Sequence, residues 1–73
     1  MSRYRVKYTY LEYSNNIHGR VENGYDEFEA ENAQDAVEQC RQEFYIASNV
    51  HITSVSKWSP YGYWIPISDN AWA

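Results

Sequence analysis

The side chains with the clearest potential for chemistry are a single cysteine and two histidines. Cys40 would need a general base and a lowered pKa to act as a thiolate nucleophile. It falls among the apolar positions of a helical pattern, which favours packing in the core. A closed zinc site needs four ligands, and Cys40, His18 and His51 together supply three. We therefore expect surface or packing roles for these residues, and neither catalysis, a metal site nor a cofactor.

Carboxylates are the second chemically capable group, and they are concentrated in the middle of the chain. Residues 22–43 have a charge balance of −7, residues 1–20 a balance of +3, and the whole chain carries −4. Paired carboxylates hydrolyse glycosides only across a sugar cleft, which a chain of 73 residues is too small to build. The acids form either a solvated face or a negative patch that docks on a cationic protein groove. On the second interpretation, the contact residues are Asp26, Glu27, Glu29, Glu31 and Asp35.

Aromatic residues make up 18% of the chain, and four of them lie between Trp58 and Trp64, around a turn. Tyrosine and tryptophan are enriched at protein interfaces because they bury a large area and keep a polar group. One interpretation is that Trp58 and Trp64 close one end of the core. The other is that the segment contacts a partner, in which case Tyr61 and Tyr63, beside the turn, are the contact residues.

Direct nucleic-acid binding is an alternative hypothesis, because cations and tyrosines interleave in the first ten residues. The residues are Arg3, Arg5, Lys7, Tyr4, Tyr8 and Tyr10. Rings that stack on bases beside phosphate-binding cations are typical of single-strand binding surfaces. In a strand, however, alternate residues point to opposite faces, so one face does not present both kinds. The acidic middle of the chain also disfavours phosphate binding, so this hypothesis ranks second.

Two strands are expected in the first half of the chain. Apolar and polar residues alternate from Arg3 to Tyr13 and again from Tyr25 to Glu31, which is typical of strands. We expect a long connection across residues 14–20 and a bulge at Gly24. Antiparallel pairing would then set Arg5 and Lys7 near Glu29 and Glu27.

One helix follows the second strand. Asn32 is a good N-cap, and Asp35 stands three residues later in the capping-box position. The helix is expected to run from Ala33 to about Tyr45 or Ala47. Its apolar stripe consists of Ala33, Ala36, Val37, Cys40 and Phe44.

A third strand is expected from Val50 to Trp58, with a bulge or twist where the apolar spacing slips between Ile52 and Val55. Residues 59–62 form a proline-containing turn. A short strand from Tyr63 to Ile65 would follow, and Pro66 places it at an edge of the sheet because proline has no N–H to donate.

These elements predict an α+β fold in which a small, mainly antiparallel sheet packs on one helix, in the order β-β-α-β and a short final β. Residues 1–67 are expected to form a single domain. Residues 68–73 are expected to be a C-terminal tail, with Trp72 as its only anchor.

The arrangement resembles small phage-encoded inhibitors, in particular some anti-CRISPR proteins. The likeness lies in a short chain that begins with a Tyr/Val-rich strand, continues with the strand-to-helix segment 28–36, and ends with a strand and aromatic hairpin over residues 52–64. The resemblance implies steric blockade of a large effector complex, without catalysis. It transfers no functional residue individually.

The leading hypothesis is therefore a non-enzymatic protein that binds and inhibits a larger nucleic-acid-handling complex by steric or charge-based blockade. A self-associating structural domain, forming a homodimer through exposed rings or a strand edge, is a further alternative. No apolar run is long enough to span a membrane, and no signal-peptide core follows the first residues. With its single cysteine, the chain is expected in a reducing cytoplasm, that of the host cell if a phage encodes it.

Overall fold

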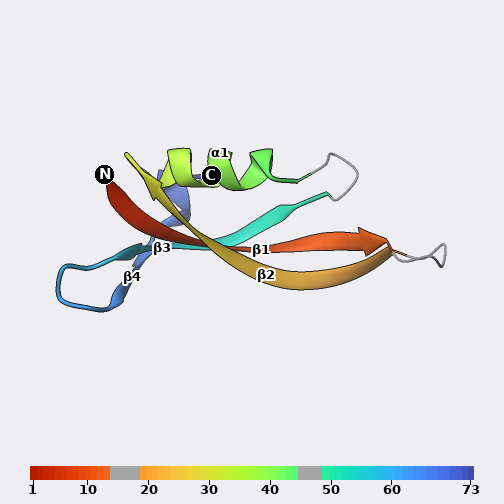
Figure 1. Ribbon diagram of the computed structural model, residues 1–73, viewed down its shortest axis with the longest axis horizontal. Helices are drawn as coiled ribbons and strands as arrows, with labels where there is room; N and C mark the ends of the chain where they lie inside the picture. The colour runs from red at the N-terminus through yellow and green to blue at the C-terminus, as the bar shows by residue number, and fades with distance from the viewer. Residues whose placement is uncertain (14–18, 45–48) are drawn as a thin grey trace.

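Four strands and one helix make up the computed structural model, which describes residues 1–13, 19–44 and 49–73 (Figure 1). The elements are β1 (Ser2–Tyr13), β2 (Gly19–Ala30), α1 (Ala33–Gln42), β3 (His51–Trp58), β4 (Trp64–Ile67) and a short 3-10 helix, η2 (Asp69–Ala71). All strand pairs are antiparallel, in the order β2-β1-β3-β4, and α1 lies across one face of the sheet. The expected α+β fold is confirmed. His18, most of the connection 14–20, Tyr45 and Ala47 lie outside the described residues.

β1 and β2 pair without interruption, but in a different register from the one expected. Arg5 lies opposite Glu27 and Arg3 opposite Glu29, so the expected pairs were wrong by two residues. β2 also begins at Gly19, six residues before the predicted strand. The ladder continues past Gly24 without a shift, so the expected bulge there is also wrong.

Gly24 has a packing role instead. It lies opposite Tyr8, and a Cβ atom at this position would lie 2.9 Å from Cε2 of the Tyr8 ring. That is closer than carbon atoms approach one another, so any side chain here would force the ring to move. The Tyr8 ring therefore packs directly on Gly24, an arrangement in which an aromatic ring covers a glycine of the neighbouring strand.

The core lies between α1 and the β1 face that carries Tyr4, Val6 and Tyr8. Small side chains on the helix face large rings on the sheet, as the apolar stripe predicts. The remaining buried residues are Ala30, Ala33, Ala36, Val37, Cys40, Ile52, Val55 and Trp72. The Phe44 and Tyr8 rings meet edge to face with centroids 4.9 Å apart, which closes the core beyond the helix end.

The helix begins and ends through local hydrogen bonds. The Asn32 side chain accepts a hydrogen bond of 2.9 Å from the Asp35 N–H, which confirms the N-cap. α1 ends at Gln42, earlier than predicted, because the N–H groups of Glu43 and Phe44 bond three residues back, to the carbonyls of Cys40 and Arg41. Such tightening ends an α-helix, so Phe44 packs from just beyond it.

The expected irregularity in the third strand is confirmed. Lys7 pairs with Ser54 and Tyr8 with Ile52, so Thr53 is an extra residue in β3. This bulge keeps both Ile52 and Val55 buried although they are three positions apart. It explains the slip in the apolar spacing.

The C-terminal part closes the sheet. The Gly62 N–H bonds to the Ser59 carbonyl at 3.1 Å, which confirms the turn, and Pro66 lies in the edge strand β4 as predicted. Beyond it, η2 leads to Trp72, which is 9% exposed and belongs to the core cluster. Most of the side chains expected as a tail are exposed, but Trp72 anchors the segment.

Replacing Gly24 with alanine tests whether the Tyr8 ring needs a glycine beneath it. We expect the free energy of unfolding to fall by about 1–3 kcal/mol, the usual effect of overpacking. The measurement is urea denaturation followed by circular dichroism. Asn23→Ala, at the exposed neighbouring position in the same strand, is the control. Equal stability of the two variants would show that Tyr8 does not need a glycine beneath it.

Candidate interaction surfaces

Acidic residues line a shallow recess of about 250 Å³ between the end of β2 and the side of α1 that carries Asp35, Glu38 and Gln42. Its acidic members are Glu29, Glu31, Asp35 and Glu38, and we call this group the acidic recess. No lysine or arginine is among the described residues that line it. Three of the five acids expected to contact a partner are thus brought together, and Glu38 joins them.

The other two acids lie elsewhere and are engaged within the protein. Asp26 points to the helix side of β2, where its carboxylate accepts a 2.8 Å hydrogen bond from the Tyr8 hydroxyl. Glu27 lies on the opposite face of the sheet and forms a 3.0 Å ion pair with Arg5. The acids predicted as one patch are therefore divided between both faces of β2 and the start of α1, as alternation along a strand requires.

Tyr61 and Tyr63 lie at the tip of the β3–β4 hairpin and are 84% and 55% exposed. Their rings stack with centroids 6.5 Å apart. The turn is held by Ser59, a fully buried residue whose hydroxyl accepts a hydrogen bond from the Tyr61 N–H at 3.0 Å. The two tyrosine rings are therefore exposed side by side on a turn that hydrogen bonds hold in place.

The hairpin tip and the acidic recess lie at the same end of the sheet but at opposite edges. Ser2 pairs with Ala30, and Tyr4 pairs with Lys57. The C-terminal ends of β2 and β3 therefore both lie beside the N-terminal end of β1. β1 and β3 separate the two edges. A partner that contacts both surfaces would have to span this end of the sheet.

The helix-free face carries a cluster that the sequence did not predict. The Arg5 guanidinium lies 4.3 Å from the centroid of the Trp64 ring and 4.9 Å from that of Tyr25. The rings of Trp64 and Trp58 meet edge to face at 5.0 Å. We call these four residues, together with the Glu27 that pairs with Arg5, the Arg5 cluster. Cation–π contacts of this kind stabilise a guanidinium among rings.

Because of the Arg5 cluster, the helix-free face carries aromatic rings as well as cations. The tyrosines of β1 point to the core, as their alternation with the cations predicts. β2 and β4 supply other rings beside Arg5, and Trp58 of β3 packs on one of them. The face therefore presents Arg3, Arg5 and Lys7 together with aromatic side chains. Strand alternation within β1 could not reveal this, because the rings come from strands distant in the sequence.

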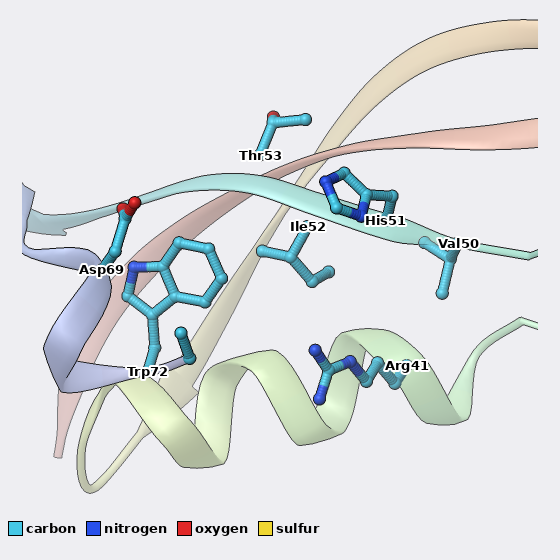
Figure 2. A pocket seen from close by; sticks show the side chains of 8 residues that line it. Arg41, Val50, His51, Ile52, Thr53, Asp69 and Trp72 are labelled. Carbon is cyan, nitrogen blue, oxygen red and sulfur yellow. The ribbon is translucent and has the colours of Figure 1, made fainter.

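A second recess, of about 630 Å³, lies between α1, β3 and the C-terminal segment (Figure 2). Ile52 of β3 and Val50, just before that strand, point toward the helix, whereas Thr53 points to the other side of the strand (Figure 2). Arg41 and Asp69 give the recess one cation and one anion, and the buried indole N–H of Trp72 has no hydrogen-bond partner among the described residues. Side chains of both signs line the recess, so it favours no single ligand charge.

Cys40 lacks the properties of a nucleophile. Its side chain is fully buried, and burial, with smaller contributions from the negative charges of Asp26 and Glu43, raises the pKa of its thiol to about 11. The thiol is thus protonated at neutral pH, the opposite of an activated thiolate. His51 is an exposed residue at the start of β3 and lines the second recess.

Comparison with protein-family models, with curated proteins and with solved structures found no match to this chain. In the described ranges, no three His, Cys, Asp or Glu side chains are grouped so that they could hold a metal ion. Across those same ranges, no helix is long and apolar enough to cross a membrane.

The buried thiol predicts a loss of stability at alkaline pH. The folded pKa of Cys40 is raised above its unfolded value of 9.0, so its contribution is fully present below pH 9 and is lost as pH rises toward 11. Burial and the hydrogen bond to Asp26 also raise the pKa of Tyr8, which adds a loss above pH 10.

Urea denaturation of the wild type and of Cys40→Ala, measured at several pH values between 8 and 11, checks this expectation. The stability advantage of the wild type should shrink as pH rises through this range. A constant difference between the two proteins would contradict the assigned burial of the thiol.

Proposed function

We propose that this chain is a non-enzymatic binding protein whose acidic recess docks on a cationic surface of a protein partner. The observation that carries the proposal is that Glu31, Asp35 and Glu38, with Glu29 at the strand edge beside them, line one recess in which no lysine or arginine is among the described lining residues. Like charges held together are costly in an isolated protein. An arrangement of this kind gains most when a cationic partner neutralises it.

The partner that fits this chemistry best is a complex that handles nucleic acid, because its binding groove concentrates lysine and arginine to neutralise phosphates. An acidic protein seated in that groove would exclude the nucleic acid by occupying the same cations. The negative net charge of the chain would also attract it toward a cationic groove during association. We therefore propose inhibition by blockade, in the manner that the resemblance to anti-CRISPR proteins implies.

Charge reversal tests the docking surface. In Glu29→Lys/Glu31→Lys the recess gains two cations, and we expect binding to a captured partner to fall at least about tenfold, since like charges would then meet. These positions are preferred to Glu27, whose reversal would also disrupt its ion pair with Arg5. The measurement is affinity by biolayer interferometry at two salt concentrations.

The matched control is Glu12→Lys/Glu43→Lys, which makes the same change in net charge at exposed positions outside the recess. It should leave most of the affinity in place. Blockade is then tested by fluorescence anisotropy of an oligonucleotide bound to the partner, which the wild type should displace. Equal loss of affinity in both double variants, or no displacement, would refute the proposal.

Direct binding of single-stranded nucleic acid is the second candidate, and the Arg5 cluster is the observation that favours it. Tyr25 is 57% exposed and Trp58 is 40% exposed, and both lie on the face that carries the β1 cations. Such rings can stack on bases while the cations contact phosphates. Glu27 and Glu29 lie on the same face and oppose that contact, which places this candidate second.

An oligonucleotide gel shift distinguishes the two candidates. Under the leading proposal the protein alone should give no shift at micromolar concentration and low salt. A shift that is lost in Tyr25→Ala and retained in Tyr61→Ala would establish the second candidate, because only Tyr25 belongs to the Arg5 cluster. Tyr61 is the control because it is an exposed ring at the distant hairpin tip.

A further inference from the structure

The hydrogen bonds of the sheet fix which backbone groups of β2 point outward. In an antiparallel ladder, residues alternate between directing both polar groups at one neighbour and directing them away. The Ser59 N–H bonds to the Tyr63 carbonyl at 2.8 Å, which extends the β3–β4 ladder one pair beyond Trp58 and Trp64. Odd-numbered residues at this end of β3 therefore direct their backbone N–H and C=O groups at β4, and even-numbered residues direct theirs at β1.

The same alternation carries through β1 to β2. Ser56 directs its backbone N–H and C=O groups at β1 and pairs with Arg5, so the backbone groups of Arg5 point at β3. The neighbouring residues Tyr4 and Val6 therefore direct theirs at β2. Their partners are even-numbered residues of β2. The odd-numbered residues of β2 accordingly direct their N–H and C=O groups away from the sheet.

An independent contact agrees with this assignment. The side chain of Gln39, from α1, donates a hydrogen bond of 3.0 Å to the carbonyl of Glu29, an odd-numbered residue. The helix thus covers the last outward carbonyl of the edge. Farther back along β2, four residues offer outward N–H and C=O groups, and no strand pairs with them in the part of the chain that the structure describes. They are Val21, Asn23, Tyr25 and Glu27.

The charges beside this edge select its occupant. β2 contains four acids and one arginine, so pairing with β2 of a second copy would oppose two strongly negative strands. Centred on Gly24, such a pair would set Glu22 opposite Asp26 of the second copy. A strand with lysine or arginine opposite Glu22 and Asp26 would instead gain two favourable cross-strand pairs. These pairs would form in addition to the bonds that the two carboxylates already make with Arg20 and Tyr8.

We propose that the outer edge of β2, from Val21 to Glu27, is a β-augmentation site for an extended segment of a protein partner that carries lysine or arginine at alternate positions. The main-chain hydrogen bonds would supply affinity, and the alternate cations would supply specificity. This inference rests on the proposed function, since it gives the mode in which a cationic partner is held beside the acidic recess.

Amide exchange measured by NMR tests the site, with a peptide of alternating lysine and threonine residues as the probe. Bound peptide should slow exchange at the amides of Val21, Asn23, Tyr25 and Glu27. A peptide of alternating glutamate and threonine should leave exchange unchanged. Protection by both peptides, or by neither, would overturn the proposal.

Variants of the edge complete the test. Asn23→Pro removes an outward N–H without removing a bond to β1, and we expect at least about tenfold weaker peptide binding with the β1–β2 amides still protected. Asn23→Ala keeps the N–H and should bind normally. Asp26→Asn should weaken binding by about two- to five-fold, whereas Glu43→Gln, the same charge change at the helix end, should not.

The outcomes separate this inference from the proposed function. If a captured partner loses affinity on charge reversal of the acidic recess but Asn23→Pro binds it as the wild type does, docking is electrostatic and the edge is not used. That result would overturn the β-augmentation site and leave the proposed function in place. Loss of binding in Asn23→Pro with normal binding in Asn23→Ala supports it.

Discussion

The Tyr8 side chain makes the contacts that hold β1, β2 and the segment after α1 together. Its ring lies over Gly24, its edge meets Phe44, and its hydroxyl bonds to Asp26, so one side chain joins β1 to β2 and to the segment beyond the helix. The bulge at Thr53 begins beside it and returns Ile52 to the core. A domain with so few large buried side chains depends on such shared contacts, because each large apolar group contributes only about 1.5–3 kcal/mol.

Local patterns predicted the elements, and non-local contacts decided what the patterns left open. Alternation, the Asn32 cap and Pro66 indicated the strands, the helix start and the edge, because each depends on neighbouring residues. The register of β1 with β2 depends on the fit of Tyr8 to a glycine across the ladder, which no local signal contains. Likewise, the burial of Trp72 requires a core built by other elements.

The aromatic excess of the sequence divides between the two faces of the sheet. One set of rings fills the core under α1, while on the helix-free face Tyr25 and Trp64 lie against Arg5 and Trp58 packs on Trp64. Of the site predicted from sequence, Glu29, Glu31 and Asp35 do share a recess, whereas Asp26 and Glu27 serve internal contacts. Spacing could place acids on faces of a strand, but it could not show which of them another side chain would engage.

The acidic recess, with the adjacent edge of β2, is the surface proposed to contact a cationic partner. Zero-length carbodiimide cross-linking of a captured complex tests it most directly, because this chemistry joins a carboxylate only to a lysine in contact with it. We predict links from Glu31 and Glu38 to partner lysines. Links confined to Glu12 and Asp69, which lie outside the recess, would contradict the account.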